Sequence, residues 1–280
     1  MKNRKVAFVG GGNMTRAIAV GLIDSGFAPI DIFISEPVDE ARLSLKNELP
    51  GVNLSAVNND IVAAAGCLVL SVKPQILPEV CRDLKTSVQK ERPLIVSIAA
   101  GIRGTDIDAW LGGGLSVVRI MPNQPALLQL GVSGLYANEK TSDDERDYAA
   151  GIIGAVGAVV HVGSEADINV VTAISGSGPA YFFLLIDVLM KTAVDFGIAE
   201  ESARTLAIET ARGAAALADS ECESMDTLMA RVRSPAGTTA AALHSLESAN
   251  VRDIFRAAIT AARDRANLLA DEAHTIGTET

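Results

Sequence analysis

The sequence lacks several features that mark particular classes of protein. It has only three cysteines among 280 residues, Cys67, Cys81 and Cys222, and no Cys-x-x-Cys pair, which argues against a disulfide framework and the common zinc or redox motifs. Lysine and arginine number 24 against 34 aspartates and glutamates, and a net charge of −10 argues against a nucleic-acid partner, which needs clustered cations. We therefore expect reduced cysteines in a cytoplasmic protein.

Long apolar runs and repeats are missing as well. The most apolar stretch, residues 180–190, is interrupted by Asp187 and is shorter than the roughly 18 residues of a membrane span, so we expect a buried helix and no membrane contact. The basic start of the chain is not followed by the apolar segment of a signal peptide, so no export is expected. With 49% hydrophobic and 21% charged residues, the chain can bury a globular core, and its length suggests two domains.

Short β-type runs alternate with helical ones in the first part of the chain. The clearest strands are expected at residues 6–9, 30–34, 67–72, 94–98 and 117–120, with a weaker one near Leu54. Residues 131–162 add two more strands around a helix that begins near Ser142, where Ser-Asp-Asp-Glu supplies a cap and an acidic first turn. The alternation predicts an α/β fold with a doubly wound parallel sheet in a first domain, residues 1–163.

The β signal disappears after Glu165, and alanine-rich helical segments follow. They are expected at residues 168–174, 180–196, 201–219, 225–233, 239–246 and 251–272. Small residues such as those at 212–216 let helices approach closely, as is common in intertwined helical bundles. Residues 164–280 are therefore predicted to form an all-α domain that also makes a dimer.

A glycine turn follows the first expected strand. Gly10 allows the tight turn, Gly12 lets the backbone approach a pyrophosphate, and the helix that begins there offers N–H groups to that anion. Thr15 stands where a strict motif has glycine or alanine, and a strand-to-helix turn without a ligand is the alternative. We interpret the turn as a dinucleotide site of the Rossmann type.

Three further segments follow strands of the same sheet. Glu36 lies about twenty residues beyond the glycines, where a carboxylate accepts from the adenosine ribose and repels a 2′-phosphate, which favours NADH; a solvated loop glutamate is the alternative. The segments 71–74 and 99–101 end later strands, and the carboxyl ends of parallel strands line the ligand crevice. Lys73 can reach a phosphate or ribose there, and Ala100 is small enough to lie against a nicotinamide.

Two turns in the helical half have the composition of helix starts. Ser175-Gly176-Ser177-Gly178-Pro179 places proline at a first helical position with two serines as caps. Ser234 to Thr239 precedes another alanine-rich helix and presents backbone N–H groups and two hydroxyls, where a small carboxylate fits. For each turn, the alternative is that these residues only cap the helix and bind no ligand.

Six motifs in order over nearly the whole chain closely resemble those of pyrroline-5-carboxylate reductases. They are Gly10-Gly11-Gly12-Asn13-Met14, Ser71-Val72-Lys73-Pro74, Ser97-Ile98-Ala99-Ala100-Gly101, Arg119-Ile120-Met121-Pro122-Asn123, Ser175-Gly176-Ser177-Gly178-Pro179-Ala180-Tyr181 and Ser234-Pro235-Ala236-Gly237-Thr238-Thr239. The resemblance implies an oxidoreductase that reduces 1-pyrroline-5-carboxylate to L-proline with NADP(H) or NAD(H), the last step of proline biosynthesis. It also implies a homodimer formed through the helical domain, assembled in some relatives into larger rings such as a decamer.

The resemblance also implies roles for individual residues. The cofactor site comprises Gly10, Gly11, Gly12, Asn13, Met14, Glu36, Asn58, Ser71, Val72, Lys73, Pro74, Ala99, Ala100 and Gly101. The substrate site comprises Glu165, Ser177, Gly237, Thr238 and Thr239, with Thr239 catalytic and no metal. Thr15 in place of a small residue, Gln124 in place of threonine, Asn169 in place of aspartate and Ala236 in place of glycine depart from the family pattern.

The expected chemistry asks little of the side chains. A cyclic imine accepts hydride best when its nitrogen is protonated or hydrogen-bonded, and its carbon must lie close to the nicotinamide. The helix start at residues 237–239 is expected to hold the substrate carboxylate while the Thr239 hydroxyl orients the ring nitrogen. His161, His244 and His274 are scattered, and we expect structural or exposed positions for them. The alternatives are a reductase of another imine or of a β-hydroxyacid, and a dinucleotide sensor without turnover.

Overall fold

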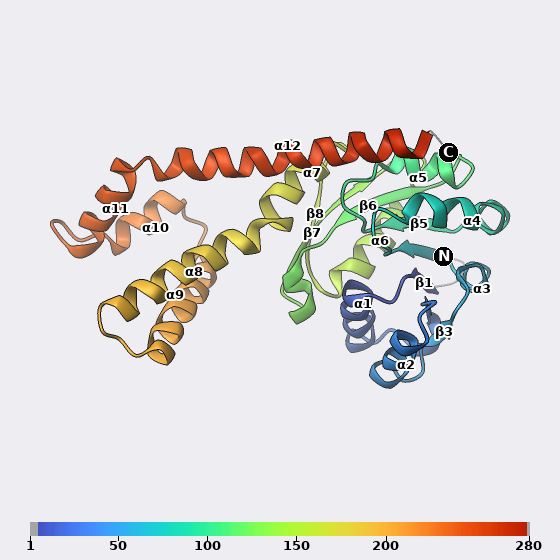
Figure 1. Ribbon diagram of the computed structural model, residues 1–280, viewed down its shortest axis with the longest axis horizontal. Helices are drawn as coiled ribbons and strands as arrows, with labels where there is room; N and C mark the ends of the chain where they lie inside the picture. Colours follow the sequence, from blue (N-terminus) through green and yellow to red (C-terminus); the bar gives the residue numbers. More distant parts are fainter. Residues whose placement is uncertain (1–4, 279–280) are drawn as a thin grey trace. The chain divides into compact units, whose positions relative to one another are not determined.

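The computed structural model of the chain describes residues 5–278, and within them eight strands form one sheet (Figure 1). The strands stand in the order β3-β2-β1-β4-β5-β6-β7-β8. Their bounds are β1 Val6–Val9, β2 Ile32–Ser35, β3 Asn53–Ser55, β4 Cys67–Leu70, β5 Leu94–Ser97, β6 Val117–Met121, β7 Gly131–Ala137 and β8 Gly157–His161. The first six strands are parallel, β7 is antiparallel to β6, and β8 is parallel to β7. The order reverses between β1 and β4, where ligands bind in sheets of this type.

Both faces of the sheet are covered, because alternate residues of each strand point to opposite sides. On β1, Val6 and Phe8 join one apolar cluster, whereas Ala7 and Val9 join the other. The first face is covered by α1 (Asn13–Asp24), α2 (Asp39–Glu48) and α6 (Asp143–Gly154). The second is covered by α3 (Asn58–Val62), α4 (Leu77–Glu91) and α5 (Gly104–Trp110). The predicted doubly wound sheet is confirmed.

The start of α6 shows how closely local sequence sets an element. The Ser142 hydroxyl accepts from the Glu145 N–H, and the Glu145 carboxylate accepts from the Ser142 N–H, which forms a capping box. Asp143 and Asp144 add negative charge to the first turn, which the helix dipole favours. The cap predicted at Ser142 is confirmed.

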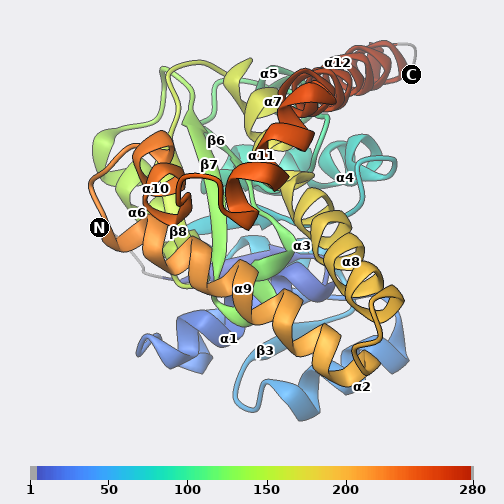
Figure 2. The same ribbon diagram turned by 90° about the vertical axis from the view of Figure 1, so that its left-hand side faces the viewer.

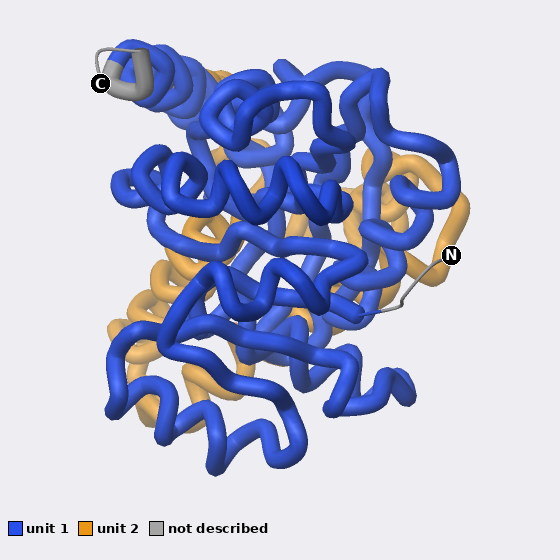
Figure 3. Tube along the Cα trace, turned by 90° about the vertical axis from the view of Figure 1, so that its right-hand side faces the viewer, with its two compact units in different colours: residues 1–177, 262–280 blue, residues 178–261 orange. Residues whose placement is uncertain are grey.

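The chain divides into two compact units (Figure 3): residues 1–177 with 262–280, and residues 178–261. The second unit is helical, with α8 (Gly178–Asp195) packed along α9 (Glu200–Ser220), followed by α10 (Met225–Val232) and α11 (Thr238–Ser248). The long α12 (Val251–Thr278) begins in this unit, and its later part belongs to the first. The boundary expected after residue 163 lies shortly after β8 and 14 residues before the end of the first unit's first segment at residue 177.

The second unit buries little of its own apolar surface. Within residues 178–261, all of which are described, the buried residues are Gly178, Ala203 and Ala207. Figure 2 shows α8 lying beside α9, yet Phe182 and Phe183 of α8 are 62% and 60% exposed. The expectation that residues 180–190 form a buried helix is wrong for the single chain, because the apolar side chains outnumber the partners that two helices offer.

A π-helical turn, η3 (Thr172–Gly176), joins α7 (Asp167–Val171) to α8. The helix start expected at residues 175–179 is confirmed in its position, because α8 begins at Gly178, but the π turn directly precedes it in place of an exposed loop. By length and composition alone the helical stretch Asp167–Asp195 could cross a membrane. The core helix of a soluble protein meets the same two criteria. Pro179 lies in the first turn of α8, where its missing N–H leaves the Ser175 carbonyl without its usual helical donor.

Candidate active site

The glycine turn links β1 to α1 at the reversal of strand order. Gly10 has a φ of +103°, and a Cβ there would lie 3.0 Å from both the Ser71 carbonyl oxygen and Val72 Cγ1. Gly12 precedes α1, no described side chain caps the helix, and no described heavy atom lies within 4 Å of a Cβ built on Gly12. The first N–H groups of α1, including those of Asn13 and Met14, therefore have no capping side chain among the described residues. The turn fits the pyrophosphate of a dinucleotide.

Glu36 follows β2 and bends back over this turn. Its Oε2 accepts from the Gly11 N–H at 3.1 Å, and its Oε1 accepts from the Val38 N–H at 3.1 Å. Each carboxylate oxygen keeps a lone pair, so the group can still accept from a ribose hydroxyl. A Cβ on Gly11 would come within 2.5 Å of Leu45 Cδ1 and 3.3 Å of Glu36. Glu36 thus forms part of the glycine turn. Neither sequence interpretation of Glu36, as a ribose ligand or as a solvated loop residue, predicted this contact.

The remaining residues predicted for the cofactor lie at the same edge of the sheet. Ser71 follows β4 and contacts the glycine turn, and residues 72–74 continue from it, with Lys73 exposed. Residues 99–101 follow β5, and Asn58 begins α3 after β3. Gly101 has a φ of +68°, and a Cβ there would lie 3.2 Å from Leu269 Cβ of α12. All residues predicted for the cofactor site therefore lie at the carboxyl ends of β1 to β5.

Glu165 of the predicted substrate set is held by two donors. Its Oε1 accepts from the Gly104 N–H at the start of α5 and from the Arg119 guanidinium at 3.2 Å. Arg119 lies on β6 and is only 3% exposed, and burial lowers its pKa while Glu165 opposes that shift. Both side chains line a cavity of about 300 Å³ together with Tyr136 and Lys140. Glu165 is thus a fixed carboxylate at the wall of a polar cavity.

Asn123 connects two of the six motifs. Its Nδ2 donates to the Ser175 carbonyl at 3.1 Å, the carbonyl that Pro179 leaves without a helical donor, and its Oδ1 accepts from the Val132 N–H at 3.0 Å. The Ser177 N–H donates to the Thr172 carbonyl at 2.8 Å, within the π turn. Ser177 is therefore placed by this turn rather than as a helix cap.

The other predicted substrate residues begin α11 in the second unit. Gly237 precedes the helix, and no described side chain caps it, so the N–H groups of Thr238 and Thr239 are open to an anion. A Cβ on Gly237 would come 2.1 Å from the Ser234 hydroxyl, so a larger residue there would force the Ser234 side chain to move. Ala236 has a φ of +56°, a left-handed conformation that glycine adopts without strain, which explains the glycine of the family pattern.

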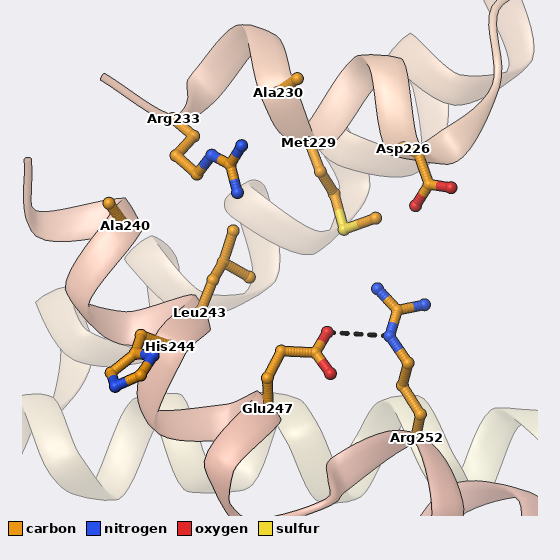
Figure 4. A pocket seen from close by; sticks show the side chains of 9 residues that line it. All are labelled: Asp226, Met229, Ala230, Arg233, Ala240, Leu243, His244, Glu247 and Arg252. Carbon is orange, nitrogen blue, oxygen red and sulfur yellow. Dashed lines mark hydrogen bonds and ion pairs between the residues drawn. The ribbon is translucent and has the colours of Figure 1, made fainter. Parts of the chain in front are cut away.

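A second cavity, of about 470 Å³, lies within the second unit (Figure 4). Figure 4 shows Met229 of α10 and Leu243 of α11 pointing into it, and Glu247 and Arg252 paired at 2.8 Å along one side. The described lining includes none of the predicted substrate residues. His244 is part of the wall and is exposed, as expected.

Comparison with known proteins matches both halves of the chain. Residues 165–269 match the family described as pyrroline-5-carboxylate reductase dimerisation, and residues 5–101 match the one described as NADP oxidoreductase, coenzyme F420-dependent. The pyrroline-5-carboxylate reductase of Pseudomonas aeruginosa is 41% identical over 97% of this chain and 99% of that protein, and the one of Arabidopsis thaliana is 33% identical over 95% of each. This chain belongs to the pyrroline-5-carboxylate reductase family.

Solved structures of the pyrroline-5-carboxylate reductase family have the same fold. The reductase from Coxiella burnetii superposes with a TM-score of 0.90 at 39% identity, over 95% of this chain and 98% of that one. The Plasmodium falciparum enzyme, solved with NADP bound, gives 0.84 at 26% identity over 96% and 99%. The predicted family, fold class, enzyme class and nicotinamide cofactor are confirmed.

Several residues of this site escaped prediction. The sequence motifs assign no role to Arg119, although an arginine that is buried in a strand is seldom without a partner. The Asp106 carboxylate is buried, its Oδ1 lies 2.6 Å from His274 Nδ1, and within the described chain its Oδ2 has no hydrogen-bond partner. His274 therefore has the structural position expected for it. Among residues 5–278, no group of three or more His, Cys, Asp or Glu side chains is placed to hold a metal ion.

Proposed function

We propose that this chain reduces 1-pyrroline-5-carboxylate to L-proline with NADPH or NADH, as the last step of proline biosynthesis. The observation that carries the proposal is the pair of uncapped helix starts, α1 behind Gly12 and α11 behind Gly237, in a chain of this family. The first suits a dinucleotide pyrophosphate and the second a small carboxylate. When bound, the reduced nicotinamide supplies the hydride for the carbon of the C=N bond.

The chain's own residues bind and orient the reactants. The N–H groups at the start of α1, with Asn58 and the segments 71–74 and 99–101, form the proposed cofactor site, and Glu36 faces the adenosine ribose. The N–H groups of Gly237, Thr238 and Thr239 bind the substrate carboxylate. The Thr239 hydroxyl orients the ring nitrogen, and Glu165 and Ser177 complete the substrate site. A protonated imine is the better hydride acceptor.

We also propose a domain organisation and an assembly. Residues 1–163 form the dinucleotide-binding domain, and residues 164–280 form the substrate and dimerisation domain. The scarcity of buried residues in 178–261 supports a homodimer in which the partner covers α8, and dimers assemble further into a decamer. The enzyme acts in the cytoplasm.

Initial rates with 1-pyrroline-5-carboxylate test the reaction. Oxidation of NADPH and of NADH is followed separately, and L-proline is assayed as the product. We expect turnover, with NADH favoured over NADPH because the Glu36 carboxylate repels a 2′-phosphate. Tight dinucleotide binding without turnover would instead favour a different imine or β-hydroxyacid substrate, or a sensor.

Thr239 is tested by a pair of variants. Thr239→Val removes the hydroxyl and keeps the shape, and we expect kcat/KM to fall about 10²-fold, as for loss of one oriented donor. Thr239→Ser keeps the hydroxyl and is the control, with most of the activity retained. Near-normal turnover in Thr239→Val would contradict the role of the hydroxyl.

A further inference from the structure

The peptide between Gly10 and Gly11 is held from both sides. Its carbonyl oxygen lies 2.7 Å from Thr15 Oγ1 and 3.0 Å from Ser71 Oγ, and its N–H donates to Glu36 Oε2 at 3.1 Å. Because a trans peptide is planar and its C=O and N–H point in opposite directions, these contacts fix the orientation of the whole plane.

The two hydroxyls form one unit. Thr15 Oγ1 and Ser71 Oγ are 2.7 Å apart, and Ser71 Oγ also lies 3.0 Å from the Val9 carbonyl. Two arrangements of the hydroxyl protons satisfy these contacts. In one, Thr15 donates to the Gly10 carbonyl and accepts from the Ser71 hydroxyl. In the other, Thr15 donates to the Ser71 hydroxyl, which itself donates to the Val9 or Gly10 carbonyl. Thr15 is fully buried, and removing either hydroxyl takes one hydrogen-bond partner from the other.

The fixed peptide sets the start of α1. The next carbonyl, that of Gly11, accepts from Arg16 Nε at 3.2 Å, and the Gly12 carbonyl accepts the first helical bond from the Arg16 N–H at 3.0 Å. The Gly11 N–H is already engaged by Glu36, so the donors left for an anion are the N–H groups of Gly12, Asn13 and Met14. They lie directly after the fixed Gly10–Gly11 peptide.

We infer that Thr15, together with Ser71, is a positioning residue for the dinucleotide. Thr15 stands where the family pattern has a small residue, and here its hydroxyl ties the glycine turn to the end of β4. The turn of this chain is therefore pre-organised by side chains as well as by backbone conformation, which lowers the cost of ordering it around a pyrophosphate. The inference rests on the proposed cofactor site.

Dinucleotide binding without turnover tests the inference. The dissociation constants of NADPH and NADH are measured by fluorescence titration for the wild type, Thr15→Val, Thr15→Ser, Ser71→Ala and the double variant Thr15→Val/Ser71→Ala. We expect Thr15→Val to weaken binding about tenfold, equivalent to about 1.4 kcal/mol. Thr15→Ser should stay within about twofold of wild type, and the double variant should bind about as weakly as the single ones, because the hydroxyls act together.

Controls separate positioning from a general loss of structure. Thr141→Val removes a hydroxyl that bonds Asn138 Oδ1 at 2.7 Å in the same unit but outside the turn, and it should leave dinucleotide binding unchanged. The KM for 1-pyrroline-5-carboxylate should also stay within about twofold in Thr15→Val, since the proposed substrate residues are elsewhere. If Thr15→Val does not fold, Ser71→Ala carries the measurement.

Three results would overturn the inference. Wild-type affinity in both Thr15→Val and Ser71→Ala would show that the hydroxyls do not position the turn. Equal weakening by Thr15→Ser, which keeps the hydroxyl, and by Thr15→Val, which keeps the methyl group, would assign the effect to side-chain packing rather than to the hydroxyl. Full additivity in the double variant would show that the two hydroxyls act independently. Failure of the wild type to bind either dinucleotide would instead overturn the proposed function, and this inference with it.

Discussion

Arg119 is a buried cation, and two acidic side chains offset the cost of burying its charge. Glu165 pairs with it at 3.2 Å, and Asp106 also opposes the lowering of its pKa by burial. Loss of the guanidinium leaves Glu165 without its cation and removes a positive charge near the buried Asp106 carboxylate, which keeps its contact with His274. Removing one partner of a buried pair costs more than the pair itself contributes.

We therefore expect Arg119→Met to lower the free energy of unfolding by about 3 kcal/mol. Denaturant unfolding measures it. Arg146→Met is the matched control, because Arg146 forms an ion pair with Asp143 on the exposed surface, where such pairs contribute about 0–1 kcal/mol. Equal losses in the two variants would show that Arg119 is not a buried charge in solution.

The cysteines differ in accessibility. Cys67 and Cys81 are buried, and burial raises the pKa of both thiols, that of Cys81 to about 12, whereas Cys222 is exposed. A thiol-specific reagent at pH 8 should therefore modify one thiol rapidly in the native protein and three after denaturation.

The same shift links stability to alkaline pH. A thiol whose pKa is raised on folding stabilises the protein fully below its ordinary pKa near 9, and that contribution is lost as pH rises toward 12. Rapid native labelling of two or three thiols would contradict the burial of Cys67 and Cys81.

At the scale of elements, the later part of α12 is held to the first unit by small residues and ion pairs. Ala266 and Ala270 are 5% and 3% exposed, and Gly101 lies against Leu269 of the same helix. Further contacts are the ion pairs Asp271–Arg103 and His274–Asp106 and the hydrogen bond Asn267–Asn169. Asn169, one of the departures from the family pattern, thus has a partner on α12.

We expect Ala270→Asp to release this part of α12, because a carboxylate without a partner would be buried there, at a cost of about 3 kcal/mol. Limited proteolysis should then cut within the last turns of the helix. Leu268→Asp introduces the same group at a position that is 54% exposed on the same helix, and it should resist protease like the wild type. The same cleavage in both variants would contradict the docking.

The elements predicted best are those whose signals are local. The strand at residues 6–9 and the cap at Ser142 depend on apolar runs and on a side chain three residues from its partner. The π turn at 172–176 is not predicted, and the Ser175 carbonyl within it accepts from Asn123, more than fifty residues away in sequence. Local sequence carries the first kind of information and not the second.

At the scale of the whole molecule, the single chain leaves the apolar residues of α8 uncovered. Phe182, Phe183 and Leu184 are each about 60% exposed, in a unit whose own buried residues are few. Monomeric proteins rarely leave so many apolar side chains together in water. A partner chain over α8 is the arrangement that the family's dimerisation segment favours.

The double variant Phe182→Asp/Phe183→Asp should therefore shift the mass measured by light scattering from a dimer or larger assembly to a monomer, since charge cannot be buried at an apolar interface. Leu43→Asp, on α2 of the first unit and also 60% exposed, should keep the wild-type mass. An unchanged mass in the double variant would contradict dimerisation through α8.

The sequence by itself determined the family, the sheet with helices on both faces, and the glycine turn at the end of β1. Apolar runs, turn residues and short motifs specify these features within stretches of a few residues. The tertiary structure alone decided which side chains fix those motifs: Thr15 with Ser71, Glu36 with Gly11, Arg119 with Glu165, and Asn123 with Ser175. These partners lie between 25 and 56 residues apart along the chain, and only the packing of strands and helices brings them within hydrogen-bond distance.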